Sequence, residues 1–135
     1  MGNGRWQMVD GGMTMDAKEM NRRTKAFTLR VLKLCRALPR TVEAQTVRHQ
    51  LARCGTSVGV NYRATQRARS KAEFRAKLGV VLEEADESSF WLEVIMEDGM
   101  LPTSRVQPLY TECNELISMF VAGMNTATLS NQRGR

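Results

Sequence analysis

The side chains of this sequence that most often serve catalysis or metal binding are one histidine, three cysteines and a run of carboxylates. His49 is the only histidine, and no local signature of a Ser-His-Asp or Cys-His triad surrounds it. The cysteines lack the C-x2-C spacing of a zinc site; they are Cys35, Cys54 and Cys113. Each falls in an apolar helical pattern, where a free thiol packs as a small hydrophobic side chain. We therefore expect buried free thiols, and no catalytic residue, metal or cofactor.

The carboxylates lie within five consecutive residues, at Glu83, Glu84, Asp86 and Glu87. Bundles that bind two iron ions use Glu-x-x-His motifs on two helices, and this sequence contains none. If the chain forms a helical hairpin about residues 69–70, Arg53 lies opposite about Glu87. We expect Arg53 to pair with Glu84 or Glu87, and these residues with Asn61 to form a structural polar core. A contact with a partner is the alternative.

Basic residues form two groups. The first lies within an arc of about 80° on an expected helix at 100° per residue; it comprises Arg22, Lys25, Lys33, Arg36 and Arg40. The second gathers at the expected hairpin tip, at Arg63, Arg67, Arg69, Lys71, Arg75 and Lys77. Such stripes neutralise nucleic-acid phosphates without recognising base sequence, so we take both groups, Lys77 apart, as candidate DNA- or RNA-binding residues. A solvated basic face is the alternative.

The charge of the chain is unevenly distributed. The net charge is +6, but residues 1–78 hold 17 Lys/Arg against 5 Asp/Glu, whereas residues 79–135 hold 3 against 9. This asymmetry suits a half that binds a polyanion, or two halves that attract each other. Tyr62 is the only aromatic residue among the basic ones that could stack on bases, and "GVNYRA" lacks the lysine and spacing of a phosphate-binding loop.

These side chains must be positioned by helices, because apolar residues recur every three or four positions. We expect helices over 16–38, 42–68, 70–98 and from about 104–107 to 126. Their ends carry ordinary signals: capping residues at Asp16, Thr41 and Ser70, a stop at Gly99, and Pro108 in the first turn of the last helix. Phe27, Leu51, Leu78 and Leu116 then share one interior. The predicted fold is all-α, an antiparallel up-down-up-down four-helix bundle.

The segments outside the bundle have no helical period. We expect residues 1–15 to be a disordered extension, 16–126 to be the bundle and 127–135 to be a flexible tail. No apolar run approaches the roughly 20 residues that span a bilayer, and the start lacks the apolar segment of a signal peptide. We therefore expect a cytoplasmic protein without a membrane partner.

Three positions on the expected second helix are unusual. Gly55 and Gly59 lie four residues apart, which implies the close approach of another backbone, most simply that of the third helix. Asn61 falls on the apolar row, where a buried amide can specify register or oligomeric state. The alternative is a rotated helix that leaves Asn61 at the rim of the core.

A second apolar row lies off the main seam of two helices. It comprises Val80, Trp91 and Val94 on the third helix and Leu29 and Leu32 on the first. A monomeric bundle needs one apolar stripe per helix, so the extra row suggests a subunit interface. A wide core-facing stripe is the alternative.

The stretch "QLARCGTSVGVNYRATQRARSKAEFRAKLGVVLEEADESSFWLE", residues 50–93, resembles a bacterial four-helix-bundle family. Its members include proteins encoded in intervening sequences of 23S rRNA genes and the accessory variability determinants of diversity-generating retroelements. The resemblance covers about residues 20–125. The matching pieces are Leu38-Pro39, Gln50-Leu51, Ser57, Asn61, Arg69-Ser70, Glu73-Phe74, Leu78, Glu84 and Glu87.

The resemblance implies a ring-like homo-oligomer, typically a pentamer, without enzymatic activity. The retroelement members are basic and bind nucleic acid and a reverse transcriptase. This chain departs from the family at residues 61–65, where many members have Asn-Ile-Ala-Glu-Gly and this chain has Asn-Tyr-Arg-Ala-Thr, so the region is more basic. The leading hypothesis is a nucleic-acid-binding accessory protein, and the alternative is a protein–protein interaction bundle with no nucleic-acid role. An enzyme or metalloprotein is the third.

Overall fold

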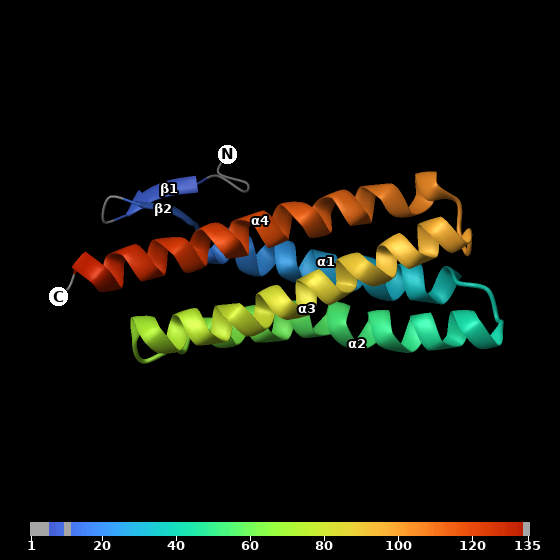
Figure 1. The fold of residues 1–135 in the computed structure, drawn as a ribbon, viewed down its shortest axis with the longest axis horizontal. Helices are drawn as coiled ribbons and strands as arrows, with labels where there is room; N and C mark the ends of the chain where they lie inside the picture. The colour runs from blue at the N-terminus through green and yellow to red at the C-terminus, as the bar shows by residue number, and fades with distance from the viewer. Residues whose placement is uncertain (1–5, 10–11, 134–135) are drawn as a thin grey trace.

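A computed structural model describes residues 6–9 and 12–133 of the chain. The described chain contains four long helices: α1 (Ala17–Ala37), α2 (Val42–Thr65), α3 (Lys71–Asp98) and α4 (Thr103–Arg133). Each helix runs antiparallel to the one before it. Each helix packs beside the next one along the chain, and α4 returns to α1 (Figure 1). The prediction of an up-down-up-down four-helix bundle is confirmed.

Local signals in the sequence account for most helix ends. The side chains of Asp16, Thr41 and Ser70 accept hydrogen bonds from the first-turn backbone N–H groups of α1, α2 and α3, at 3.0, 3.2 and 3.0 Å. Gly99 ends α3 in the left-handed conformation with φ 75°, which a residue without a Cβ adopts at little cost. The connections between helices are consequently short, which holds consecutive helices side by side.

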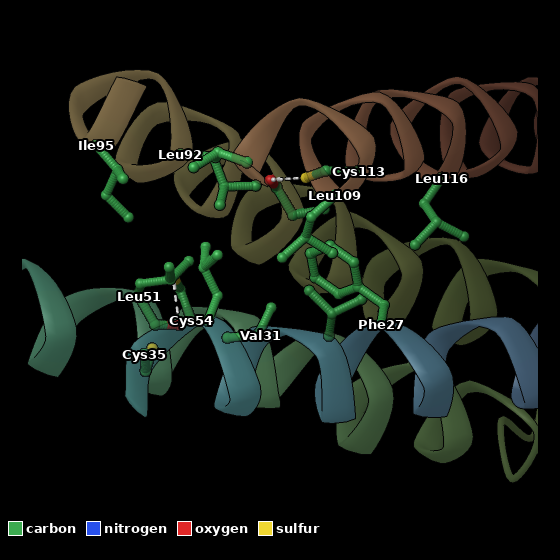
Figure 2. Close-up of a cluster of buried hydrophobic side chains, with 14 of the residues drawn as sticks. Phe27, Val31, Cys35, Leu51, Cys54, Leu92, Ile95, Leu109, Cys113 and Leu116 are labelled. Carbon is green, nitrogen blue, oxygen red and sulfur yellow. Dashed lines mark hydrogen bonds between the residues drawn. The ribbon is translucent and has the colours of Figure 1, made fainter. Parts of the chain in front are cut away.

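The core lies where the apolar rows of the helices meet. Phe27, Leu51, Leu78 and Leu116 are each at most 2% exposed and belong to one buried cluster, as the predicted shared interior requires. Figure 2 shows Phe27 and Leu116 on one level of this cluster and Leu51 and Leu92 on another. At roughly 25 cal/mol per Å² of buried apolar area, this cluster is the main source of stability.

Within α2 the predicted apolar row is buried at every position except Asn61. Tyr62 is buried, whereas Asn61 is half-buried at the rim, so the prediction that the Asn61 amide lies in the core is wrong. The Tyr62 ring stacks on Phe120 of α4 with centroids 6.0 Å apart. An aromatic ring gains more from burial than an amide does, which favours the burial of Tyr62.

The glycines of α2 face α1, not the third helix, so the predicted packing partner is also wrong. A Cβ atom at Gly55 would lie 2.7 Å from Val31 Cγ1, and one at Gly59 would lie 2.8 Å from Thr28 Oγ1. Both distances are shorter than any normal contact. The absence of side chains at these two positions is therefore what lets α1 and α2 pack closely.

The ends of the bundle differ from the predicted boundaries. Residues expected to be disordered include a two-stranded antiparallel hairpin, β1 (Trp6–Val9) and β2 (Gly12–Met15), which lies beside α4 (Figure 1). For residues 1–5, 10–11 and 134–135 the expectation lies outside the described residues. At the other end α4 continues to Arg133, through most of the expected tail.

Two internal boundaries also shift. The second helix ends at Thr65 and not at residue 68, which leaves a short connection before Ser70. The last helix begins at Thr103, so Pro108 lies in its second turn and not in its first. Among the described residues, no helix combines the length and apolar character needed to cross a membrane.

Candidate nucleic-acid interface

All ten predicted nucleic-acid-binding residues are exposed, but they do not form one site. The set comprises Arg22, Lys25, Lys33, Arg36, Arg40, Arg63, Arg67, Arg69, Lys71 and Arg75. Arg22 pairs with Glu19 one turn away on α1, and this hydrogen bond lowers the pKa of the Glu19 carboxyl. Arg36 and Arg40 lie on open surface at the end of α1. The places that can bind an anion are those where basic residues from different helices line the same cavity.

One such place is a cavity of about 270 Å³ between α1 and α2. Lys25 of α1 and Arg63 of α2, from the two separate basic groups of the sequence, both line it. The rest of the lining is polar or small: Asn21, Thr28, Gly59 and Val60. Neither Lys25 nor Arg63 pairs with a carboxylate of the described chain, so both charges remain available for an anion.

A second meeting place lies at the tip of the α2–α3 hairpin. Arg69 and Lys71 line a shallow cavity of about 470 Å³, together with the aromatic side chains of Tyr62 and Phe74. The other basic residues predicted for the tip lie outside this lining: Arg63, Arg67, Arg75 and Lys77. Phe74 is a contributor that the basic pattern alone does not reveal, because on sequence it belongs to the core row of the third helix.

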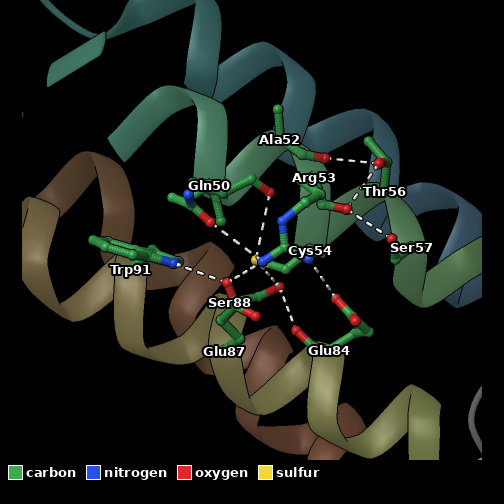
Figure 3. A network of polar contacts seen from close by, with 11 residues as sticks. Gln50, Ala52, Arg53, Cys54, Thr56, Ser57, Glu84, Glu87, Ser88 and Trp91 are labelled. Carbon is green, nitrogen blue, oxygen red and sulfur yellow. Dashed lines mark hydrogen bonds and ion pairs between the residues drawn. The ribbon is translucent and has the colours of Figure 1, made fainter. Parts of the chain in front are cut away.

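Arg53 holds α2 against α3 as the hairpin register predicts, but at the rim of the bundle (Figure 3). It donates to Glu87 and lies 3.6 Å from Glu84 Oε2, and its side chain is 52% exposed. Trp91 Nε1 also donates to Glu87 Oε2, at 3.3 Å. Glu84 Oε2 is buried and accepts no hydrogen bond from the described chain, so the 3.6 Å pair with Arg53 is its only compensation. The cluster is therefore a surface ion pair and not a polar core.

Two arginines outside the predicted groups have structural roles. Arg48 of α2 donates to the carbonyls of Cys35, Leu38 and Pro39 at the end of α1, at 3.0–3.1 Å. Arg23 of α1 pairs with Glu112 and Glu115 of α4, and the hydrogen bond to Glu112 raises the pKa of the Arg23 guanidinium. Sequence reasoning missed both, because their partners lie on other helices or in the backbone.

The three cysteines are buried and free, as predicted. Burial raises the pKa of Cys35 to about 11 and that of Cys113 to about 12, and it raises the pKa of Cys54 as well. Cys113 Sγ donates to the Ala85 carbonyl at 3.3 Å (Figure 2). Thiols held protonated in this way are poor nucleophiles and poor metal ligands. Over the described part of the chain, no group of three His, Cys, Asp or Glu side chains is arranged to hold a metal ion.

Comparison with known proteins agrees with the bundle. A family model described as 23S rRNA-intervening sequence protein matches residues 18–122. A crystal structure of a protein of unknown function from the S23 ribosomal protein family, from Bacteroides thetaiotaomicron, superposes with a TM-score of 0.70. It is 26% identical in sequence, and the match covers 78% of this chain and 97% of that one. No curated protein matches the chain.

Proposed function

The chain belongs to the 23S rRNA-intervening sequence protein family, and we propose that it is a non-enzymatic accessory protein that binds DNA or RNA through the phosphates. The observation that carries this proposal is the α1–α2 cavity, which Lys25 and Arg63 both line and where neither pairs with a carboxylate of the described residues. Cations that are already paired gain little from a phosphate, whereas unpaired ones release counterions when they bind it.

The geometry favours contact with the nucleic-acid backbone over recognition of bases. The α1–α2 cavity has no aromatic side chain in its lining, and the exposed cations beside it are flexible lysines and arginines. Phosphate contacts position a protein on a nucleic acid but carry no sequence information. At the hairpin tip, Arg69 and Lys71 line a separate cavity, with Tyr62 and Phe74 beside them.

A salt series tests the proposal. The chain should bind a closed circular duplex at about 50 mM salt and lose affinity steeply by about 200 mM. Lys25→Gln and Arg63→Gln should each weaken binding, and each should reduce the salt slope by about one because one phosphate contact is lost. Filter binding measures both quantities.

Lys77→Gln is the matched control, because it removes the same charge from α3, outside the lining of this cavity, at a lysine that already pairs with Glu73. Its affinity and salt slope for the closed circle should equal those of the unaltered chain. Absence of binding at low salt, or an affinity that does not change with salt, would refute the proposal.

A protein partner is the second candidate, and exposed leucine on α1 favours it. Leu29 is 58% exposed and lies seven residues from both Arg22 and Arg36, so the three side chains share one face. An exposed leucine adds no affinity to a surface that binds phosphates, whereas it can pack against an apolar side chain of a protein partner. A reverse transcriptase, the partner that the retroelement resemblance suggests, would be recovered in a pull-down that survives nuclease treatment.

We also propose that copies of the chain associate. Phe90 is 55% exposed on α3 and stands on an acidic face with Glu83 and Asp86, which are exposed as well. This face complements the α1 face around Leu29 in charge, and each places one apolar side chain among the charges. A contact of α1 on α3 between copies is heterologous, so it closes into a ring if the rotation permits, as in the pentamer that the resemblance implies.

A further inference from the structure

Charged side chains line the contact between α1 and α4, and they are paired at one end of it and lack a carboxylate partner among the described residues at the other. At one end, Arg23 Nη2 lies 2.6 Å from Glu112 and 3.0 Å from Glu115. Two turns further along α1, Arg30 and Lys33 line a cavity of about 230 Å³ with Arg105 of α4. None of these three cations pairs with a carboxylate in the described part of the chain. The α1–α4 contact thus ends in a pocket that has cations but no counter-charge.

The position of this pocket in the fold adds to its positive potential. Arg105 lies in the first turn of α4, where the helix dipole is positive and acidic residues are the stabilising ones. That turn contains no acidic residue. Three like charges around one cavity repel each other, and an anion between them adds an attraction to each cation that offsets this repulsion. An anion is therefore the ligand that this arrangement fits.

We propose that the Arg30–Lys33–Arg105 pocket binds a phosphate monoester, whether the terminal phosphate of a nucleic acid or a free phosphorylated metabolite. A monoester carries about −1.5 to −2 charges near neutral pH, and three cations match it better than they match the single charge of a backbone phosphodiester. Arginine adds planar, two-pronged donation to phosphate oxygens.

The dimensions and floor of the pocket agree with this ligand. Its volume is several times the roughly 30 Å³ of a water molecule in the liquid, which leaves room for a phosphate and the start of its ester group. Leu34 and Leu109 form an apolar floor that the carbon atoms of the ester can contact. The site is separate from the α1–α2 cavity and shares no lining residue with it. This inference goes beyond the proposed function, since a monoester could bind here even if duplex nucleic acid did not bind the chain.

Three probes at one fixed ionic strength test the proposal on the full chain. AMP carries the monoester, the dinucleotide ApA with free hydroxyl ends carries only a diester, and adenosine carries no phosphate. Amide chemical shifts followed by NMR should saturate with AMP at least about tenfold more tightly than with ApA, and adenosine should not bind. Inorganic phosphate should shift the same amides, those of residues around Arg30 and Arg105.

Arg30→Gln and Arg105→Gln should each weaken AMP binding at least fivefold, whereas Arg40→Gln, which removes an exposed charge of α1 outside the pocket, should change it less than twofold. All three positions are exposed, and the spectra themselves report whether each variant is folded. Equal affinity for AMP and ApA, or an equal loss in Arg40→Gln, would overturn the proposal. So would a changed particle mass in Arg105→Gln, which would place the pocket at a contact between copies.

The source of the monoester is a separate arm of the experiment. If the ligand is a nucleic-acid end, a short linear strand with a 5′-phosphate should bind more tightly than the same strand with a 5′-hydroxyl. This difference in affinity should be seen only in the chain with an intact pocket. If AMP binds but the two strands bind equally, the ligand is a free metabolite. If the unaltered chain binds AMP but not the closed circular duplex, the result counts against the proposed function alone. If it binds the closed circular duplex but not AMP, the result counts against this inference alone.

Discussion

Gly55 and Gly79 are both interior helix positions, yet the space next to them is different. A Cβ at Gly55 would lie 2.7, 2.9 and 3.2 Å from three atoms of the buried Val31 side chain, so no rotation of Val31 clears it. The nearest atom to a Cβ at Gly79 is Met124 Cε, at 3.7 Å, which is an ordinary contact. The same residue type is thus required by packing at one site and is only a local weakness at the other.

Gly55→Ala should destabilise the chain, because overpacking costs about 1–3 kcal/mol and exceeds the helix propensity gain of up to about 1 kcal/mol. Gly79→Ala, the matched control, should stabilise the chain by about 0.5–1 kcal/mol. Urea unfolding followed by circular dichroism measures both changes. If the two variants moved the free energy of unfolding in the same direction, the α1–α2 contact would not be as close as described.

At the scale of the helices, the end of α1 depends on a side chain from α2. Arg48 donates to three carbonyls in and after the last turn of α1, at Cys35, Leu38 and Pro39. The Cys35 carbonyl also accepts from the Leu38 N–H at 3.3 Å, but the Leu38 carbonyl lies beyond the last residue of α1, and a half-buried carbonyl without a donor costs free energy. One guanidinium therefore fixes both the end of α1 and the angle at which α2 leaves it.

Arg48→Gln should lower the free energy of unfolding by about 1–3 kcal/mol, because the glutamine amide is too short to reach all three acceptors. Arg40→Gln, eight residues earlier and exposed, should change it by less than about 0.5 kcal/mol. Urea unfolding gives the values, and hydrogen exchange of the last amides of α1 should accelerate only in Arg48→Gln. Equal effects of the two changes would show that the carbonyl contacts contribute nothing.

At the scale of the whole molecule, the two signs of charge are segregated on opposite halves of the sequence, and each half exposes apolar side chains. The α1 face around Leu29 is basic, and the α3 face around Phe90 is acidic. Trp91 packs edge-to-face on Phe90 with ring centroids 5.0 Å apart, which holds the exposed ring in one orientation. The second apolar row expected from the sequence is only partly exposed: Val80 and Leu29 are, whereas Leu32, Trp91 and Val94 are half-buried.

If copies associate through these faces, the particle mass in solution should be a multiple of 15.2 kDa. Phe90→Lys should reduce it toward a single copy, because it removes the apolar contact and places a positive charge on the α3 face that would have to meet the basic α1 face. Val42→Lys, at a residue that is 81% exposed on α2, is the control and should leave the mass unchanged. A single-copy mass at tens of micromolar, or equal dissociation by both changes, would exclude this interface.

Much of this molecule is decided locally. The capping side chains of Asp16, Thr41 and Ser70 and the stop at Gly99 act on backbone groups a few residues away, so helix positions follow from sequence alone. The apolar rows likewise predict which residues are buried, because the helical period is the same in every fold. The exposure of the basic residues follows in turn, since charged groups stay in water.

Which neighbouring helix each side chain meets was decided only by the tertiary structure. Tyr62 and not Asn61 is buried, and the α2 glycines face α1, because the packing of all four helices together settles which side chains meet. For the same reason no pattern along the chain could place Lys25 beside Arg63, or Arg30 beside Arg105. A sequence specifies which charges a helix carries, but only packing determines which charges of two helices share a cavity.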